Sequence, residues 1–336
     1  MKRPITPRSY LILLLLYGFP FLVVLSITPF IGSETVHLNE ILQIFKEGGW
    51  NTSAEIFFFQ RIPRVILAAL VGGTLAVVGA SFQVILHNPL AEPYTLGITG
   101  GASIGATVAI LFPWLMASWW VFNTVQIFAL AGSFCVLWII YFISRRPEGV
   151  TIFTLLLAGV TVSIMSAGAI MFLRYLASPY LLLQMDRWKM GGLDVIGYRE
   201  LAALCPLLLP GLGILFSCMV ELNHLTMGEE LASGHGVDVA GVQKRVFIGG
   251  GLATAAVVSM SGPIGFVGLI VPHTVRQLSG YDHRIVLPAS FFLGGAFLVV
   301  CDTVARTIFS PTELPVGIIT ALVGGPLFIR ILLNKN

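Results

Sequence analysis

Long apolar runs alternate with short polar connections along almost the whole chain. A helix needs about 20 apolar residues to cross a bilayer, and ten runs come close to that length. The third run is rich in glycine, and the seventh and eighth are short and meet at a Ser-Gly-Pro sequence. The pattern predicts an all-α polytopic membrane protein, a single domain over residues 1–336, with spans near residues 9–30, 62–84, 94–113, 119–143, 151–173, 197–220, 244–261, 264–279, 286–305 and 315–333.

One polar segment, Glu221–Arg245, interrupts this apolar pattern. Thr226 can cap the N-terminus of a short helix there, and Glu229, three residues later, can complete a capping box. Gly234 and Gly236 then end that helix, because glycine adopts the conformations that stop a helix. The spacing therefore predicts a short soluble helix between two membrane spans.

A second helix is predicted directly after this stop. Asp238 can cap its first turn, and Val237 and Val242 are spaced as a hydrophobic staple across the cap. Two capped helix starts in a polar connection are typical of a surface that another protein binds. We therefore expect residues 221–243 to contact a partner.

The placement of basic residues orients the chain. The apolar run Tyr10–Phe30 is long enough to span and shows no small-residue cleavage site, so it predicts a first transmembrane helix rather than a signal peptide. An even number of spans puts both termini on one side. Arg145-Arg146 and Lys244-Arg245 lie at span ends, and basic residues favour the cytoplasm. We expect both termini and the polar segment to be cytoplasmic.

Composition excludes most soluble and catalytic classes. The chain has 336 residues, of which 56% are hydrophobic and only 10% charged, whereas soluble domains carry about a quarter charged residues. No HExxH, GxSxG or Walker A motif is present, so we expect no catalytic residue, no resident metal or cofactor and no nucleotide hydrolysis by this chain. The four cysteines lie in apolar runs without CxxC spacing and are expected to be small buried residues: Cys135, Cys205, Cys218 and Cys301.

Few ionisable residues are expected within the membrane. Asp302 lies near the outer end of the ninth span and Arg174 just beyond the fifth. A transporter driven by a proton or sodium gradient normally needs buried carboxylates, so their near absence argues against this alternative. An intramembrane enzyme would need paired polar residues at mid-span, and none pair in the sequence. If a substrate moves, its energy comes from elsewhere, and an ATP-hydrolysing partner could bind the polar segment.

Glycine spacing indicates close helix packing. Gly97, Gly101 and Gly105 repeat every four residues and leave one helix face without side chains. Such faces let membrane helices approach closely. The same faces would also suit helices that tilt during a transport cycle, and the two interpretations are compatible.

Four separate sequence motifs resemble one known family. They are the stretches at Arg61–Gly105, Ser261–Arg306 and Glu313–Ile329 (ELPVGIITALVGGPLFI), together with MGEELASGHGVDV in the polar segment. In order and spacing they closely resemble the permease subunits of the ABC importers for iron–siderophore, haem and cobalamin. The resemblance implies two permease copies with twenty helices, two ATPase subunits below them and a substrate-binding protein above. It also implies that Mg-ATP binds the ATPase subunits, and that this chain lies in the cell (inner) membrane and binds no nucleic acid.

The resemblance also implies roles for particular residues. Contacts with the ATPase are expected within the polar segment, at Thr226, Glu229, Glu230, Ala232, Gly236, Val237 and Asp238. The alternative for the two glutamates is a solvated helix face. Docking of the binding protein is expected at three outer arginines: Arg61, Arg64 and Arg306. Arginine suits this role because its planar fork grips a carboxylate at two points. For the first two, the alternative is an interaction with lipid headgroups.

The translocation path implied by the family runs along the dimer axis beside the fifth and tenth spans. The matching positions are small or weakly polar: Ala158, Gly159, Thr161, Ser163, Ser166, Ala167, Gly317 and Thr320. The inner gate is expected before the fifth span, at Gly149, Ile152 and Phe153, where the two apolar residues depart from the small polar residues common in the family. The charged stretch at residues 185–192 either contacts the binding protein or forms a salt-bridged loop. Iron–siderophore is the expected cargo, with cobalamin and haem next and oxyanions possible.

Overall fold

Helices account for most of the structure, a computed structural model that describes residues 7–32, 34, 41, 51–115, 122–146, 149–150 and 152–333. Ten apolar helices correspond one to one to the ten expected spans. They are α1 (Pro7–Ile27), α4 (Ile62–Ile85), α5 (Ile98–Leu111), α6 (Thr124–Ser144), α7 (Ile152–Tyr175), α9 (Arg199–Ser217), α12 (Val239–Ser261), α13 (Val267–Ser279), α14 (His283–Thr307) and α15 (Val316–Leu333). The predicted all-α architecture is thereby confirmed.

Shorter elements connect these helices. They are η1 (Thr28–Phe30), α3 (Thr52–Glu55), η2 (Ile56–Arg61), η3 (Pro93–Leu96), η4 (Pro113–Leu115), β1 (Arg145–Arg146), β2 (Gly149–Val150), α8 (Pro179–Lys189), α10 (Met219–Leu225) and α11 (Glu229–Gly234). The two strands form a small antiparallel hairpin. The helix α8 was not expected, because its charged sequence was interpreted as a connecting segment.

Six of the described helices are long and apolar enough to cross a membrane by length and composition. The helices α5 and α13 have only 14 and 13 residues, or about 20 Å at the rise of an α-helix, against about 30 Å of hydrocarbon. Irregular backbone precedes each of them, at residues 86–97 and 262–266. Leu96 and Ile264 in these segments are buried by protein, which is where non-helical backbone is tolerated in a membrane. The spans predicted at 94–113 and 264–279 therefore began too early.

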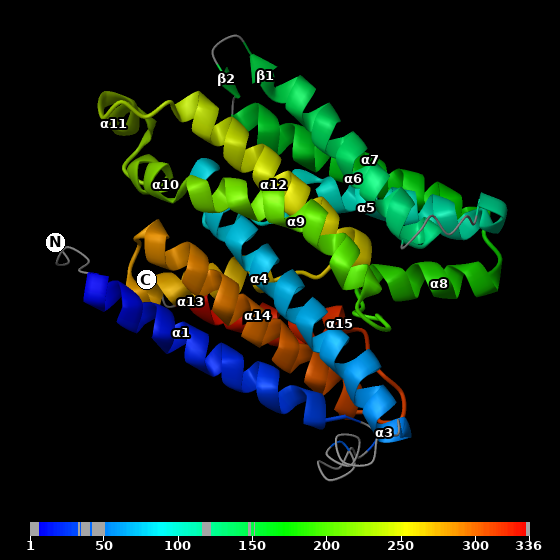
Figure 1. Cartoon of the computed structure of the whole chain (residues 1–336). Helices are drawn as coiled ribbons and strands as arrows, with labels where there is room; N and C mark the ends of the chain where they lie inside the picture. Colours follow the sequence, from blue (N-terminus) through cyan, green and yellow to red (C-terminus); the bar gives the residue numbers. More distant parts are fainter. Residues whose placement is uncertain are drawn as a thin grey trace.

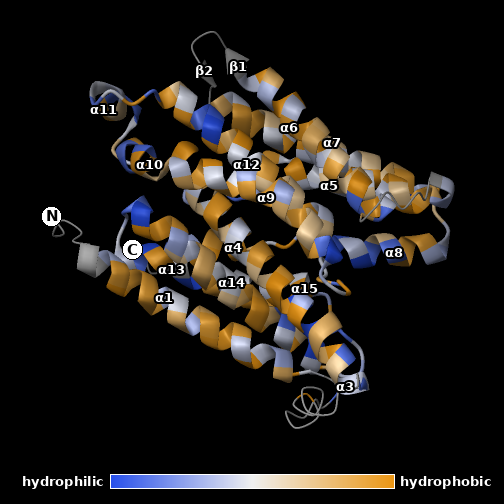
Figure 2. Cartoon of the chain, viewed as in Figure 1, coloured by the Kyte–Doolittle hydropathy of each residue, from blue (hydrophilic) through white to orange (hydrophobic). Residues whose placement is uncertain are grey.

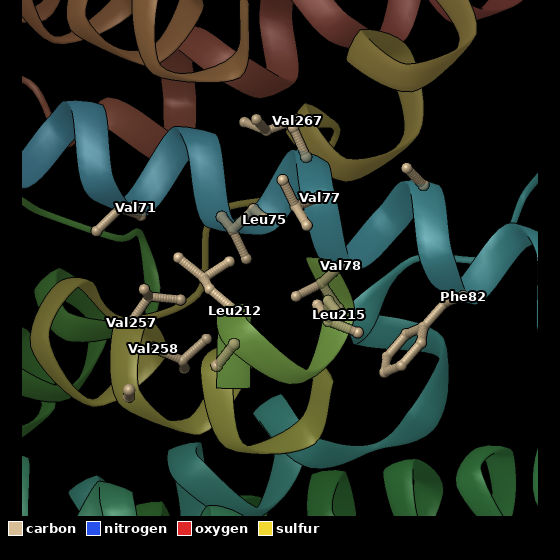
Figure 3. Close-up of a cluster of buried hydrophobic side chains, with 14 of the residues drawn as sticks. Val71, Leu75, Val77, Val78, Phe82, Leu212, Leu215, Val257, Val258 and Val267 are labelled. Atoms are coloured by element: carbon tan, nitrogen blue, oxygen red, sulfur yellow. The ribbon is translucent and has the colours of Figure 1, made fainter. Parts of the chain in front are cut away.

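The helix α4 lies at the centre of the bundle. Of the 18 residues in the most apolar stretch of this segment, 89% are buried. Figure 3 shows its apolar side chains next to those of α9, α12 and α13. Glycine lets backbones touch here: a Cβ on Gly79 would lie 1.9 Å from the carbonyl oxygen of Gly268 in α13. A Cβ on Gly105 would lie equally close to the carbonyl oxygen of Phe128 in α6. Close packing, the interpretation given to the glycine repeats, is confirmed at Gly105.

The bundle has two distinct polar ends. The start of α1 and the elements α10, α11 and the β-hairpin lie at one end, and α3 and α8 lie at the other (Figure 1). Hydrophobic residues cover the long helices between them, and polar residues are seen on α8 and α11 (Figure 2). A bilayer-sized apolar belt therefore separates two hydrated faces.

The cysteine prediction is correct for two of the four residues. All four cysteines are free, Cys218 and Cys301 are buried as expected, and Cys205 is half-buried. Cys135 is exposed on α6, because the outer face of this helix is turned away from the bundle. Hydropathy alone does not distinguish a lipid-facing position from one inside the protein.

Candidate functional site

Three arginines from two distant parts of the sequence meet at the end of the bundle that carries α3 and α8. Arg61 ends η2, Arg64 is in the first turn of α4, and Arg306 is in the last turn of α14. They line a cavity of about 500 Å³, which also contains Gly32, Glu34, Ile56, Gln60, Asp194, Val195, Ile196, Glu200 and Glu313. The structure thus brings the predicted docking residues together on one face.

Acidic groups of the same chain bind two of these arginines. Asp302 is 1% exposed and lies between them. Arg64 donates to both of its carboxylate oxygens, with Nη2 3.0 Å from Oδ1, and Arg64 Nη1 donates to Glu313 at 2.6 Å. Arg306 Nε lies 3.1 Å from Asp302 Oδ2, an ion pair without the alignment of a hydrogen bond. One half-buried and one buried cation therefore share one buried anion.

Arg61 also binds acceptors of this same chain. It is 5% exposed and donates to the carbonyl oxygens of Pro29, at 3.1 Å, and of Glu34. The structure places the three arginines at one end of the bundle, with Arg61 and Arg306 buried and Arg64 half-buried, and this burial was not expected from the sequence. An incoming carboxylate would have to exchange with an internal partner.

The polar segment folds differently from the sequence prediction. Thr226 is the C-cap of α10, not an N-cap, and its hydroxyl donates to the carbonyl oxygen of Asn223 at 2.7 Å. Gly228, with φ of 108°, precedes α11, so the predicted capping box does not form. Glu229 instead accepts a hydrogen bond from Gln243 Nε2 of α12 at 2.8 Å. The capping box was wrong because a separate helix, α10, occupies Met219–Leu225, so Thr226 ends a helix rather than starting one.

The second predicted cap is confirmed. Asp238 accepts a hydrogen bond from the backbone N–H of Gly241 at 3.0 Å and begins α12. Gly236, with φ of 81°, follows the end of α11, as glycine is expected to do. Val237 is half-buried against the core.

The exposed face of α11 has a different composition from the one expected. Ala232 is 1% exposed and belongs to the hydrophobic core, so it cannot contact a partner. Glu230 is exposed. Beside it, Met227 and Leu231 are 64% and 57% exposed, and the sequence analysis missed both. Their apolar character beside Glu229 and Glu230 was the available signal, since a solvated helix rarely exposes two large apolar side chains together.

The expected path residues lie on different faces of their helices. Thr161 and Ala167 are exposed on α7 and Ser163 is half-buried. Ala158, Gly159 and Ser166 of α7 and Thr320 of α15 are buried within this chain, whereas Gly317 is half-buried. A run of consecutive residues cannot line one surface of a helix, because each residue turns by about 100°. The outward face of α7 consists mainly of large apolar residues: Phe153, Leu157, Val160, Ile164, Met165, Met171 and Phe172.

The expected gate lies where the β-hairpin meets α7. Gly149 pairs with Arg146 in the hairpin, and Ile152 is the first residue of α7. Phe153 is 74% exposed. Figure 1 shows the hairpin at the same end as α11.

A carboxyl group outside the expected spans has an unusual environment. Burial raises the pKa of Glu92 from 4.5 to about 7, although a hydrogen bond with the backbone of Phe266 opposes the shift. This bond joins the two irregular segments before α5 and α13. The sequence analysis missed Glu92 because the connection was read as an ordinary loop.

Arg174 and Asp186 form an ion pair between α7 and α8, and the hydrogen bonds from the arginine lower the pKa of the aspartate. The charged stretch after residue 184 is therefore partly a paired surface of α8. Among the residues that the structure describes, no three His, Cys, Asp or Glu side chains gather as a metal site.

The sequence profile of the FecCD transport family matches residues 18–334. The chain belongs to the FecCD transport family. It is therefore a transmembrane permease subunit of an ABC transporter and not itself the ATPase. The motifs on which the resemblance was based lie within the matched residues.

Relatives across bacteria and archaea agree with this assignment. The chain is 37% identical to YvrB of Bacillus subtilis, an uncharacterised ABC transporter permease, over 95% of this chain and 93% of that one. It is 35% identical to the hemin transport permease HmuU of Yersinia pestis, over 94% and 95% of the two chains. It is 40% identical to the cobalamin import permease BtuC of Halobacterium salinarum, over 82% and 73%.

A solved structure shares the fold. It is an ABC transporter assigned to the metal-chelate type, in an inward-facing conformation, with a TM-score of 0.82 and 28% identity. The match covers 98% of this chain and all of the other. Ten apolar helices with two shortened members are therefore consistent with a known permease architecture.

Proposed function

We propose that this chain imports a metal chelate as a homodimer, with two ATPase subunits and an extracytoplasmic binding protein. The cargo we favour is iron–siderophore, with cobalamin or haem next. Mg-ATP binds the partner ATPases, and this chain holds no cofactor. The membrane is the cell (inner) membrane, and both termini are cytoplasmic.

The observation that carries this proposal is the exposed surface of α11. The helix α11 lies at the same end as the start of α1 (Figure 1). It carries the exposed Glu230 and Leu231, and the exposed Met227 lies just before it. The adjacent α10 contacts α14, and α11 contacts α12, so a force applied to α11 reaches membrane-spanning helices through packed side chains. In this mechanism ATP binding closes the two ATPases and moves α11, and the spans reorient.

Reversing a charge on α11 and introducing one there both test this coupling. In liposomes that contain the permease, its ATPase and its binding protein, Glu230→Lys and Leu231→Asp should each reduce ATP-driven uptake at least about tenfold, since interface residues of this kind can carry more than about 1.4 kcal/mol. The matched control is Glu55→Lys, an exposed charge reversal on α3 at the opposite end. Normal uptake by both α11 variants would remove the assigned role of this helix.

Docking at the arginine cavity is proposed to occur by carboxylate exchange. Arg64 is bidentate to the buried Asp302 and separately bound to Glu313, whose side chain is 41% exposed. An acidic residue of the binding protein can replace Glu313 at Arg64 without disturbing Asp302. Glu313 thus competes with the incoming carboxylate.

This exchange makes an unusual prediction for a docking surface. Glu313→Gln removes an acid from the permease and should tighten binding-protein affinity, most strongly at low salt, where exposed charges are least screened. Asp194→Asn, at an aspartate that lines the same cavity and is 92% exposed, provides a comparison with a weaker internal contact of 4.0 Å to Arg64. Weaker or unchanged docking of Glu313→Gln would count against the arginine assignment.

Cargo choice is tested separately. Uptake of radiolabelled iron chelates, with cobalamin and haem as competitors, identifies the substrate class. Gradient-driven uptake without ATPase would instead support the secondary-transporter alternative.

A further inference from the structure

A small cavity lies where α10 and α13 end and α14 begins, at the end of the bundle that carries α11 (Figure 1). Its volume is about 280 Å³, and its lining residues are Gln83, Val84, His87, Pro89, Thr226, His273, Arg276, Gln277, Tyr281 and His283. None of the ten is an acid, whereas one is arginine and three are histidines. The lining therefore favours a negatively charged ligand.

Arg276 is the fixed positive charge of this cavity. No carboxylate of the described residues forms an ion pair with it, and its Nη2 donates to the side-chain oxygen of Gln83. The amide nitrogen of Gln83 donates to the carbonyl oxygen of Gly268 at 3.1 Å, which fixes the amide with its oxygen toward the arginine. A neutral amide does not balance the guanidinium charge, so Arg276 retains donors for an anion.

His283 contributes an acceptor at the same cavity. It is 1% exposed. Asn223 Nδ2 donates to Asp282 at 2.8 Å, so Asn223 Oδ1 is the acceptor for the backbone N–H of His283, at 2.7 Å, and for its ring Nδ1, at 2.9 Å. This network assigns the proton to Nδ1 and leaves Nε2 as a lone-pair acceptor in the neutral ring. Nε2 is buried without a hydrogen-bond partner.

We propose that this cavity binds a phosphate group that still carries one proton. The ionised phosphate oxygens accept from Arg276, and the P–OH group donates to Nε2 of His283. Sulfate and phosphodiesters have no such proton at neutral pH and would leave Nε2 unsatisfied. The ligand is therefore inorganic phosphate or a phosphomonoester, either dissolved or as the headgroup of phosphatidic acid. This site does not depend on the proposed transport function.

The test uses the purified full-length permease in detergent at neutral pH. Thermal stability is measured against inorganic phosphate and against sulfate at matched ionic strength. Phosphate should stabilise at about tenfold lower concentration than sulfate, the ratio expected when one buried hydrogen bond of about 1.4 kcal/mol is made by only one of the two anions.

Variants assign the effect to this cavity. Arg276→Gln should raise the phosphate concentration needed about tenfold, whereas Arg245→Gln, an exposed arginine at the same end, should leave it unchanged. His283→Leu should bring the phosphate and sulfate responses together. If that variant does not fold, the wild-type preference for phosphate over sulfate still decides the question.

Native mass spectrometry distinguishes the two sources. Retention of phosphatidic acid but not phosphatidylglycerol, without a response to free phosphate, identifies a lipid headgroup. A response to free phosphate identifies a dissolved ligand. Equal effects of phosphate and sulfate with equal retention of both lipids would overturn the proposal, as would equal binding by the Arg276 and Arg245 variants of whichever ligand the wild type prefers.

Discussion

The buried charge cluster at the C-terminal end of α14 offers the sharpest test of which interactions stabilise this fold. Asp302 is the only carboxylate within ion-pair distance of Arg306 among the described residues, and it also binds Arg64. Asp302→Asn keeps the size of the side chain and removes the charge. Arg64 retains Glu313, but Arg306, 4% exposed, becomes a buried cation without an anion.

The expected cost follows from that imbalance. Removing one partner of a buried ion pair costs about 3–5 kcal/mol, because the other charge remains desolvated. For a chain of this size the loss corresponds to a fall in apparent Tm of about 4–7 °C. The assay is thermal unfolding of the purified permease in one detergent at a fixed heating rate.

Asp186→Asn is the matched control. It breaks another arginine–aspartate pair with two hydrogen bonds, but the side chains of Arg174 and Asp186 are 29% and 42% exposed. Exposed pairs contribute about 0–1 kcal/mol, so the Tm should fall by no more than about 2 °C. Adding Arg306→Gln to Asp302→Asn should recover part of the loss, because the unpaired cation is then removed. Equal shifts in the two single variants would refute the argument that burial sets the energy.

Three further predictions concern other parts of the chain. Because burial raises the pKa of Glu92 to about 7, the folded protein holds a proton that the unfolded chain loses near pH 4.5. The contribution of Glu92 to stability should therefore be fully present below about pH 4.5 and fall by on the order of 3 kcal/mol as the pH rises to about 7, and Glu92→Gln should flatten this part of the profile of Tm against pH. Gly79→Ala should cost at least about 1–3 kcal/mol, because its Cβ meets the backbone oxygen of Gly268, whereas Gly213→Ala on α9 meets nothing within 4 Å and should be neutral or slightly stabilising in the same thermal assay. Asp238→Ala should cost about 1 kcal/mol at the start of α12; hydrogen exchange should then quicken in the first turn, and unchanged protection there would show that the cap is dispensable.

Much of this architecture was contained in the local sequence. The ten apolar runs predicted ten helices because apolar surface of that length must be buried in lipid or protein. Asp238 predicted a helix start because an N-cap is satisfied within three residues. The family motifs are likewise linear features, so the assignment to an ABC permease required no coordinates.

Tertiary packing determined the helix ends and the exposure of individual residues, which hydropathy does not predict. The shortened starts of α5 and α13 depend on neighbouring helices that satisfy irregular backbone. Thr226 is a C-cap because α10, which packs against α14, ends at Leu225. Ala158 and Ala167 look alike in sequence, yet only one faces the surface.

The arginine cavity and the phosphate cavity show most clearly what the sequence alone does not predict. Arg64 and Asp302 are 238 positions apart, and the unpaired Nε2 of His283 exists only because Asn223 fixes the other ring nitrogen. The sequence determined which segments enter the membrane, since that depends on the composition of each segment alone. Only the folded bundle determined which charges are paired, because burial and pairing depend on residues that the chain brings together from a distance.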